Sequence, residues 1–433
     1  MLIGRAKSIC GELHLPGDKS ISHRVAMIAA LATGDTVIEN YAVSSDCAST
    51  LGCLRDLGVT IERDGTTIKI HGVGRQGLSQ PAGPLDCGNS GTTIRLLAGV
   101  LAGQNFDSIL VGDESLSKRP MKRIIAPLQA MGADIESDNG HAPLTIHGGK
   151  MLRGIDHTLQ IASAQIKSCI LLAGLNADGR TNVIEPAPTR DHTELMLQWF
   201  GAKIDATQDE SDGRISVKGA QTLKGVNFSV PGDISSAAFF LVAAACLPGS
   251  ELTLRGVGLN PTRTGIIEVL RGLGVDLKIE NETTVCNEPV GDLIVRGRTD
   301  DPMGSKSNLI GGKIIANLID EIPILAILGT QLEHGLEIRD AAELRVKESD
   351  RIAAVVENLR RMSATVEEFP DGFRIARSDL VGARIDSFGD HRIAMAFAVA
   401  GRLADGETEI NGAECVDISF PGFFETLASV VSS

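Results

Sequence analysis

The chain has 433 residues, of which 43% are hydrophobic and 22% are charged, and its formal net charge is −14 at pH 7. This length exceeds what one hydrophobic core usually supports, so we expect two domains. The acidic balance argues against a general binder of nucleic acids or anionic membranes, although a local basic pocket remains compatible with it. Only 3% of the residues are aromatic, which leaves few side chains on which bases could stack.

The eight cysteines are scattered, without a CxxC pair or a Cys/His cluster of zinc-finger spacing. This pattern indicates reduced, mostly buried thiols rather than disulfides or a metal site. The N-terminal segment lacks a long apolar run, and the longest apolar stretch, residues 237–246, is too short to span a bilayer. We therefore expect a cytoplasmic protein.

A helix-to-strand junction recurs five times along the chain, centred on Gly58, Gly132, Gly201, Gly274 and Ser363. In each junction, apolar residues three apart fit one face of a helix, the central residue suits a left-handed helix end, and alternation of apolar and polar residues then begins. A second alternating run follows each junction, and a last helix at 423–431 would close a sixth unit. The sequence thus predicts six repeats of roughly seventy residues.

Six segments rich in small apolar residues alternate with these junctions, at 19–32, 89–102, 163–175, 233–245, 320–328 and 390–400. Apolar residues surround most of each predicted helix, so we expect all six helices to be buried. Each polar start, taken alone, indicates ordinary N-capping. Helix N-termini that converge would instead form an anion site. Basic residues at several starts favour a multiply anionic small molecule as the ligand; they are Lys19, Arg24, Arg95, Lys167 and Arg392.

The segments PGDKS (16–20) and PGDIS (231–235) echo each other at the first and fourth repeats. Three repeats per half is therefore the natural division. We expect the strand before Pro16 to pair with the second half of the chain, which makes one domain discontinuous and places the active site in a cleft between the domains. The predicted domains are 1–15 plus 232–433, and an inserted domain of 16–231.

Basic and glycine-rich motifs lie in the first half. LPGDKSISHR (15–24) brings an ammonium, a hydroxyl and a planar guanidinium to one helix start, and such a fork suits phosphate or carboxylate. CGNSGTTIR (87–95) has glycines that permit a close approach of backbone to ligand, although a lone Gly-rich turn is more often only a turn. Most charges of the cluster KRPMKR (118–123) are expected on solvated faces, and from it we single out Arg119.

Two further motifs follow in the third repeat. SAQIKS (163–168) offers hydroxyl, amide and ammonium groups at a helix start, which suits a polyhydroxylated anion. Arg190 in TRDH (189–192) is equally compatible with a substrate contact and with a surface ion pair.

Two carboxylates of the second half are candidates for proton transfer, Asp320 in NLIDEIP and Glu348 in LRVKESDR. Most acids are caps or surface groups. Lys347 and Arg351, however, flank Glu348, a mixture expected where a proton moves beside bound anions. Motifs of metalloproteases, P-loop hydrolases, serine hydrolases and dinucleotide-binding folds are missing from the sequence.

Taken together and in order, these motifs resemble the 5-enolpyruvylshikimate-3-phosphate synthase family from residue 15 to the C-terminus. They are PGDKSISHR, NSGTTIR, KRPMKR, SAQIKS, RDHTE, DEIP, RVKESDR and GDHRIAMA. The resemblance implies an α/β fold, a two-domain inside-out α/β barrel built from six βαβαββ repeats. It also implies a monomer without metal or organic cofactor, which transfers the enolpyruvyl group of phosphoenolpyruvate to the 5-hydroxyl of shikimate-3-phosphate by addition and elimination.

The resemblance assigns roles to individual residues. The implied contacts to shikimate-3-phosphate are Lys19, Ser20, Arg24, Ser163, Ala164, Gln165, Arg190, Asp320 and Lys347. The implied contacts to phosphoenolpyruvate are Lys19, Asn89, Gly91, Arg119, Gln165, Arg351 and Arg392. The implied acid/base groups are Asp320, Glu348 and Lys19, with their division of labour left open.

The chain departs from the family pattern near its end. Many members carry a Lys before the C-terminal Phe-Pro, where this chain has Ile418, so one phosphate contact is expected to be missing or supplied elsewhere. SAQIKS and RDHTE are typical of the second class of these enzymes.

Three other classes of protein share parts of this pattern. UDP-N-acetylglucosamine enolpyruvyl transferase shares the fold, but the loop near 112–120 lacks the Cys that this sister family typically uses. A non-catalytic protein that binds a phosphorylated ligand is disfavoured by the joint presence of Asp320, Glu348, Lys347 and Arg392. An RNA-processing cyclase of related architecture is disfavoured by the acidity and the few aromatic residues.

Overall fold

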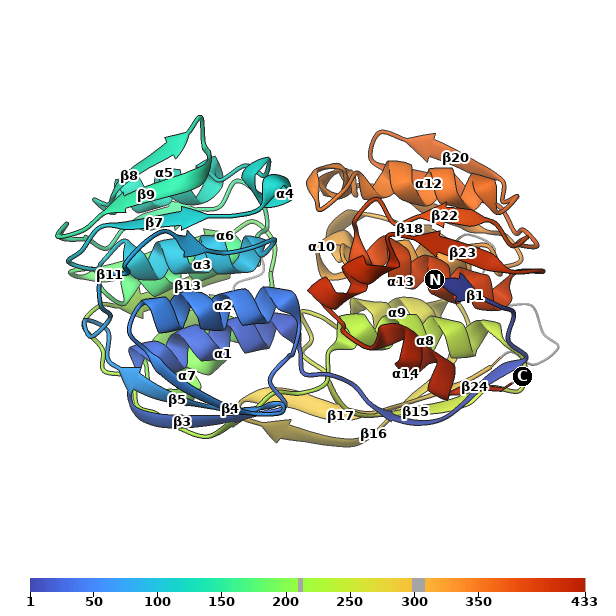
Figure 1. The fold of residues 1–433 in the computed structure, drawn as a ribbon, viewed down its shortest axis with the longest axis horizontal. Coiled ribbons are helices and arrows are strands. Elements are labelled where there is room, and N and C mark those ends of the chain that lie inside the picture. Colours follow the sequence, from blue (N-terminus) through green and yellow to red (C-terminus); the bar gives the residue numbers. More distant parts are fainter. Residues whose placement is uncertain (209–212, 298–307, 433) are drawn as a thin grey trace. The chain divides into compact units, whose positions relative to one another are not determined.

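The computed structural model describes residues 1–208, 213–297 and 308–432. The chain forms two compact units (Figure 1). The first unit consists of Met1–Pro16, Pro231–Thr284 and Pro289–Ser433. The second unit consists of Gly17–Val230 and the short segment Val285–Glu288.

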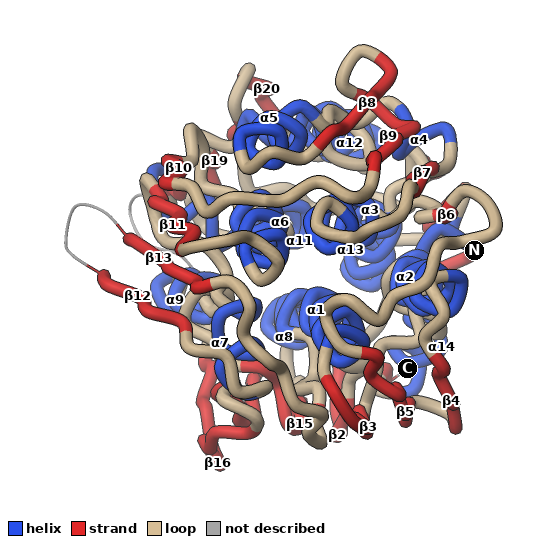
Figure 2. Tube along the Cα trace, turned by 90° about the vertical axis from the view of Figure 1, so that its left-hand side faces the viewer, coloured by secondary structure: helices blue, strands red, loops and turns tan. Residues whose placement is uncertain are grey.

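The second unit has a helical interior. Three buried helices, α1 (Lys19–Leu31), α3 (Gly91–Leu101) and α6 (Ala164–Gly174), pack together inside it. Figure 2 shows these three helices with strands on the outside. The remaining helices are α2 (Ser45–Asp56), α4 (Glu114–Ser117), α5 (Lys122–Ala130) and α7 (His192–Trp199).

Three four-stranded sheets enclose these helices, with the orders β14-β3-β5-β4, β6-β7-β9-β8 and β10-β11-β13-β12. In each sheet the first two strands are parallel and the other pairs are antiparallel. The strands are β3 (Thr33–Glu39), β4 (Thr60–Asp64), β5 (Thr67–Val73), β6 (Leu85–Asp86), β7 (Ser108–Val111), β8 (Asp134–Asp138), β9 (His141–His147), β10 (Asp156–Thr158), β11 (Arg180–Glu185), β12 (Ile204–Gln208), β13 (Gly213–Lys218) and β14 (Phe228–Ser229).

The first unit repeats this plan around α8 (Ile234–Cys246), α11 (Ile322–Gly329) and α13 (His391–Leu403). Its other helices are α9 (Gly265–Gly272), α10 (Ile315–Leu318), α12 (Arg351–Arg361), α14 (Phe423–Ser429) and the 3₁₀ turns η1 (Gly312–Ile314), η2 (Ala342–Val346) and η3 (Ala413–Ile418). The aromatic rings of Phe239, Phe240, Phe420 and Phe423 pack together and join α8 to α14.

The sheets of the first unit have the orders β16-β17-β15-β2-β24, β18-β19-β21-β20 and β1-β23-β22. The strands are β1 (Leu2–Ile3), β2 (Ser8–His14), β15 (Glu251–Gly258), β16 (Asp276–Val285), β17 (Glu288–Arg296), β18 (Leu309–Ile310), β19 (Leu336–Ile338), β20 (Val366–Phe369), β21 (Gly372–Ile375), β22 (Arg384–Asp386), β23 (Thr408–Asn411) and β24 (Val431–Ser432).

The predicted pairing of the N-terminal strand with the second half is confirmed. β2 lies parallel to β15, with Leu13 opposite Leu254. β14, which precedes α8 in the chain and falls within the inserted domain predicted as 16–231, lies parallel to β3 beside α1. This pairing of β14 with β3 was not predicted. β2 therefore precedes α1 in the chain but belongs to a sheet of the first unit, and β14 precedes α8 but belongs to a sheet of the second unit.

The five predicted junctions are all confirmed. Each central residue lies between a helix and a strand with a positive φ, from 67° at Ser363 to 103° at Gly132. In every case the following strand forms an antiparallel hairpin or sheet neighbour with the next one. Glycine relieves the strain of this conformation at four of the five places. The six apolar segments are also helical and buried, as predicted.

A search of the described residues for membrane spans found no helix with both the length and the apolar character that crossing a bilayer requires.

Candidate functional site

The start of α1 carries the first predicted cation. Asp18 caps this helix by accepting a hydrogen bond of 2.9 Å from the backbone N–H of Ile21. Such a cap satisfies one of the donors that every helix start leaves open. Lys19 follows, and its Nζ lies 2.9 Å from Oδ2 of Asp46 on α2. Its side chain is 19% exposed, so the ammonium is oriented by a carboxylate and still reaches solvent.

Arg24, one turn further along α1, is buried, and its hydrogen bonds include three neutral acceptors. Its Nε donates to Thr193 Oγ1 at 2.9 Å, its Nη1 to the carbonyl of Ser20 at 2.9 Å and its Nη2 to Ser168 Oγ at 3.1 Å. The two hydroxyls are 2.7 Å apart. Hydroxyls and carbonyls orient the guanidinium through hydrogen bonds, and its planar fork suits phosphate or carboxylate. Sequence reasoning missed Thr193 and Ser168.

The starts of α3 and α6 meet through Gln165. Its Oε1 accepts a hydrogen bond of 2.7 Å from Arg95 Nη1, and its Nε2 donates to Thr92 Oγ1 at 3.0 Å. Ser90 caps α3 through a hydrogen bond from the N–H of Thr93. The predicted Gln165 is therefore held by two groups of the neighbouring helix.

Arg119 turns toward the start of α3. Its Nη2 donates to Asn89 Oδ1 at 2.7 Å and to Ser115 Oγ at 3.2 Å, and its Nη1 donates to the Asn89 carbonyl at 3.3 Å. Asn89 in turn donates to Asp113 Oδ2 at 2.7 Å. The neighbouring Lys118 forms an exposed pair with Glu114, so the expectation that most of this basic cluster is solvated holds for Lys118.

Gly91 leaves room for two guanidiniums. A Cβ added there would lie 2.8 Å from Arg95 Nη1 and 3.3 Å from Arg119 Nη1. Any larger side chain would therefore displace at least one of these groups. The predicted residues Asn89, Gly91 and Arg119 come together at this place.

The other predicted residues of this unit are less tightly defined. Ser163 occupies the N-cap position of α6 without a side-chain capping bond, and Ala164 is the first residue of that helix. Arg190 is half-buried in the segment between β11 and α7. The expectation for Lys167 was wrong: its ammonium is not at the helix start but buried, 3.0 Å from Glu185 and 2.7 Å from Glu194.

In the first unit, Arg351 gathers three carboxylates. Its Nε lies 2.8 Å from Asp390 Oδ2, its Nη2 lies 2.5 Å from Glu348 Oε2, and its Nη1 lies 3.4 Å from Asp320 Oδ1. Burial disfavours the charged guanidinium, but the carboxylates outweigh this effect and raise the pKa of Arg351. The cluster joins the start of α12 to the starts of α11 and α13.

The three carboxylates differ in exposure. Asp320 and Glu348 side chains are 16% and 22% exposed, whereas Asp390 is fully buried. Asp390 caps α13 by accepting from the N–H of Arg392 at 2.9 Å. Arg392 itself donates to the carbonyl of Asp320 at 3.0 Å. Asp320 and Glu348 are thus solvent-accessible carboxylates held by the buried guanidinium of Arg351. Asp390 is buried and caps α13.

Two positions of the first unit lie apart from this cluster. Lys347 pairs with Glu343 at 2.8 Å rather than with one of the three carboxylates. Ile418, which replaces the Lys of the family pattern, is the last residue of η3 and is half-buried.

A second polar cluster of this unit was not anticipated. Arg263 Nη2 donates to Ser235 Oγ at 2.8 Å and lies 3.3 Å from Asp233 Oδ1. The Ser235 hydroxyl donates in turn to the carboxylate of Glu321, which is 1% exposed. This chain links the starts of α8 and α11, so the first turns of the three buried helices of this unit are joined by polar contacts.

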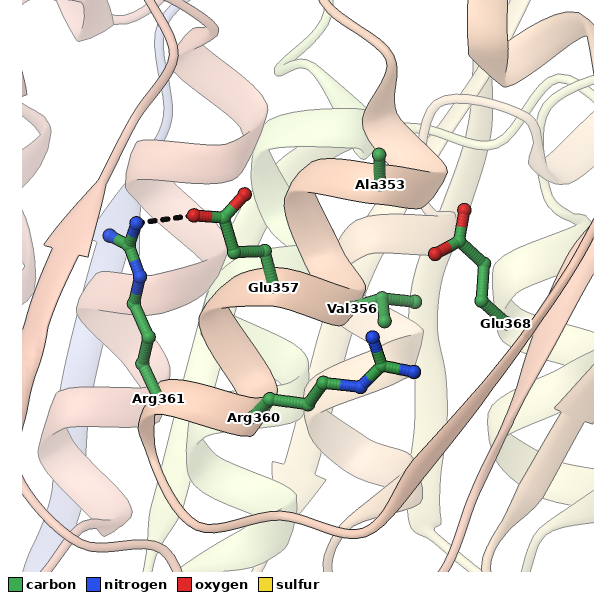
Figure 3. A pocket seen from close by; sticks show the side chains of 6 residues that line it. All are labelled: Ala353, Val356, Glu357, Arg360, Arg361 and Glu368. Atoms are coloured by element: carbon green, nitrogen blue, oxygen red, sulfur yellow. Dashed lines mark hydrogen bonds and ion pairs between the residues drawn. The ribbon is translucent and has the colours of Figure 1, made fainter.

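A surface hollow of about 510 Å³ lies elsewhere, along α12. Figure 3 shows Glu357 and Arg361 facing each other on one side of the helix, and Arg360 and Glu368 on the other. Its lining contains equal numbers of opposite charges and none of the predicted site residues, so we assign it no function. Among the residues that the structure describes, no group of three or more His, Cys, Asp or Glu side chains is placed to hold a metal ion.

Comparison with known proteins first defines the class. The solved structure of the enolpyruvyl transferase NikO from Streptomyces tendae matches with a TM-score of 0.79 and 16% identity, over 99% of this chain and 96% of that chain. The fold is therefore that of the enolpyruvyl transferases, built from six βαβαββ-type repeats as the resemblance implied.

The family is shown by closer relatives. EPSP synthase from Acinetobacter baumannii matches with a TM-score of 0.86 and 44% identity, over 99% of this chain and 97% of that chain. The 3-phosphoshikimate 1-carboxyvinyltransferase of Solibacter usitatus (strain Ellin6076) is 51% identical over 430 residues, 99% of each chain. That of Pelotomaculum thermopropionicum is 52% identical over 99% of this chain and 98% of its own.

The family model for EPSP synthase (3-phosphoshikimate 1-carboxyvinyltransferase) matches residues 3–427. The chain belongs to this family and is a transferase. This membership sets aside the three alternatives considered from the sequence.

Proposed function

We propose that each unit has its own task in one reaction. The arginines of the second unit bind anionic substrate groups. The first unit supplies the carboxylates that carry proton transfer, and it adds Arg351 and Arg392 to the binding of phosphoenolpyruvate. The observation that carries this proposal is the contrast between Arg24, oriented by hydroxyls, and Arg351, surrounded by carboxylates.

The reaction is that of the family. The chain transfers the enolpyruvyl group of phosphoenolpyruvate to the 5-hydroxyl of shikimate-3-phosphate and releases phosphate, a step of the shikimate pathway. The hydroxyl loses its proton and attacks C2, while C3 gains a proton to give a tetrahedral adduct. Phosphate then leaves as C3 loses a proton. One acid/base group is therefore needed near the hydroxyl and one near the methyl.

Asp320 and Glu348 suit these two tasks. Both are accessible, and each is held by the buried guanidinium of Arg351. A fixed carboxylate can accept and return a proton without the cost of reorienting during the reaction. We assign Lys19 the third role, as a cation that stabilises charge developing on the substrates, because its ammonium is oriented by Asp46.

The remaining residues bind. For shikimate-3-phosphate we propose Lys19, Ser20, Arg24, Ser163, Ala164, Gln165, Arg190, Asp320 and Lys347. For phosphoenolpyruvate we propose Lys19, Asn89, Gly91, Arg119, Gln165, Arg351 and Arg392. Support comes from the joint position of Asn89, Gly91 and Arg119 and from the bond between Arg392 and the Asp320 backbone. Cations held in this way would neutralise the departing phosphate.

One assay tests the function. Protein is mixed with shikimate-3-phosphate and phosphoenolpyruvate, and inorganic phosphate is followed. We expect release that requires both substrates. Release with UDP-N-acetylglucosamine in place of shikimate-3-phosphate would contradict the proposal, and binding of either substrate without release would indicate a binding protein instead.

We also propose that the chain acts as a monomer in the cytoplasm. The eight cysteines are free thiols, five of them buried, which suits a reducing compartment. Light scattering at assay concentration would test the monomer, and a molar mass of twice the 45.6 kDa chain would contradict it.

A further inference from the structure

Lys167 is the centre of a buried ionic cluster that the reaction does not use. Its side chain is 1% exposed, and its Nζ lies 3.0 Å from Glu185 Oε2 and 2.7 Å from Glu194 Oε1. The same ammonium donates to the carbonyl of Thr189 at 3.3 Å. The three charged side chains come from α6, from the end of β11 and from α7.

Such a cluster is expensive to bury. Burial raises the pKa of Glu194, although Lys167 acts in the opposite direction. The pKa of Lys167 is also raised, because its two carboxylates outweigh the effect of burial. A buried ion pair of this kind is often no more stabilising than apolar side chains of the same volume. Stability alone therefore does not explain why the ionic cluster is buried at this place, and the contacts of its neighbouring residues point to a role in positioning.

The first connection runs to Arg24. Ser168 follows Lys167 on α6, and Thr193 precedes Glu194 on α7, so the two helices face each other through two adjacent polar contacts. One is the ion pair of Lys167 with Glu194, and the other is the 2.7 Å contact of Ser168 with Thr193. The two hydroxyls of the second contact are the acceptors of Arg24. The ion pair therefore lies directly beside the two hydroxyls that meet one guanidinium.

The second connection runs to Arg190. The segment between β11 and α7 is tied to the cluster at Thr189, whose hydroxyl donates to Glu185 and whose carbonyl accepts from Lys167. Arg190 is the next residue. Fixing the backbone on one side of Arg190 restricts where its side chain can reach.

We propose that Lys167, Glu185 and Glu194 are positioning residues, which hold Arg24 and Arg190 at the geometry that the phosphate of shikimate-3-phosphate requires. This inference rests on the proposed function of those two arginines. The cluster has these two connections, and both lead to arginines that are assigned to the acceptor. Its loss should therefore weaken binding of the acceptor more than binding of phosphoenolpyruvate, whereas a purely structural role would lower stability without this selectivity.

Two variants test the inference. Thr189→Val removes the hydroxyl that ties the segment to Glu185 and nearly keeps the shape. The triple variant Lys167→Met, Glu185→Gln, Glu194→Gln removes all three charges together, so no buried charge is left unpaired. We expect each to raise the KM and the Kd for shikimate-3-phosphate about tenfold, with the KM for phosphoenolpyruvate within about twofold. Thr189→Ser, which keeps the hydroxyl, should restore the acceptor KM.

The controls separate the possible failures. Thr36→Val replaces another buried threonine of the same unit, on β3, and should leave both KM values unchanged. Arg24→Met and Arg190→Met should each raise the acceptor KM by more than tenfold. If they do not, the proposed role of the arginines is wrong. If they do, but Thr189→Val or a folded triple variant changes both KM values equally or changes the melting temperature alone, the positioning role is wrong.

Discussion

The two units surround their buried arginines with different kinds of hydrogen-bond acceptor. In the second unit, Arg24 donates to hydroxyls and a carbonyl, and Arg119 donates to an amide, a hydroxyl and a carbonyl. In the first unit, Arg351 at the start of α12 lies among three carboxylates. Neutral acceptors orient a guanidinium through hydrogen bonds, whereas carboxylates also compensate part of its charge and are themselves oriented by it.

The contrast shows that a helix start does not define a site by itself. Both units contain three buried helices with polar first turns, yet the side chains around these turns differ. Accessible carboxylates, Asp320 and Glu348, surround the arginine of the first unit, whereas the arginines of the second unit donate to hydroxyls, amides and carbonyls. The second unit does contain an ionic cluster, formed by Lys167, Glu185 and Glu194. This cluster is linked to Arg24 through Ser168, the residue that follows Lys167.

The largest expected effect comes from the carboxylates. Glu348→Gln keeps the shape and removes the titratable group, so kcat should fall by about 10²–10⁴-fold. Binding of shikimate-3-phosphate, measured by calorimetry, should be unchanged, because its proposed phosphate ligands lie in the second unit. Glu357→Gln, on the exposed face of α12, the helix that follows Glu348, is the matched control. Turnover of the Glu348 variant at the wild-type rate would show that Glu348 transfers no proton.

The next effect concerns stability. Asp390→Asn removes the fully buried partner of Arg351 and should lower the free energy of unfolding by about 3 kcal/mol, since breaking a buried pair leaves a charge poorly compensated. The matching change in the second unit, Ser168→Ala, removes a neutral acceptor of Arg24 and should cost only about 1 kcal/mol. Denaturant unfolding measures both.

Asp405→Asn, which affects an exposed pair at 3.8 Å, serves as the control for these stability measurements and should stay within about 0.5 kcal/mol of wild type. Equal losses for the variants of Asp390 and Ser168 would contradict the proposed difference between the two units.

Local features of the fold could be predicted from the sequence. At Gly58 and at Gly132, the spacing of apolar residues changes from three, as in a helix, to two, as in a strand. A residue with positive φ ends each helix there, whatever the tertiary structure. The buried helices were equally predictable, because residues such as those of 237–246 leave no polar face. These signals depend on neighbours in the chain.

Side-chain partners depend on tertiary packing and were not predictable in the same way. Arg24 meets Thr193 across 169 positions, and no spacing rule connects the two. Lys167 was placed at a helix start by its position in SAQIKS, but its ammonium is buried between Glu185 at the end of β11 and Glu194 on α7. The exchange of β14 was missed because its two residues carry almost no pattern.

A smaller effect is expected at Gly91. Gly91→Ala should push Arg95 and Arg119 apart, because the new Cβ would come within 2.8 Å of one guanidinium and 3.3 Å of the other. These are the ends of flexible side chains, so stability should hardly change. We expect the KM for phosphoenolpyruvate to rise about fivefold, or about 1 kcal/mol. Gly52→Ala in α2, where a Cβ would meet nothing within 4 Å, should leave this KM unchanged, and an unchanged KM for Gly91→Ala would argue against a role in binding.

The smallest effect concerns the protonation of one buried histidine of the second unit, His23, and its contribution to stability. The ring of His23 is fully buried, and its Nδ1 lies 2.7 Å from Thr50 Oγ1, which in turn contacts Thr93. Burial, and then the nearby Lys19 and Arg24, lower the pKa of His23 well below 6.5. The unfolded chain therefore takes up a proton, as pH falls through 6.5, that the folded chain does not.

Since the unfolded state binds more protons in this range, stability must fall with falling pH. Between pH 7 and 5.5 this one group should contribute a loss of about 1 kcal/mol. His23→Gln keeps a hydrogen-bonding side chain and removes the titration, so its loss of unfolding free energy over the same range should be smaller than that of wild type by this amount. If the unfolding free energies of the two proteins fell equally between pH 7 and 5.5, the folded protein would protonate His23 as readily as the unfolded chain does. The lowered pKa of His23 would then be wrong.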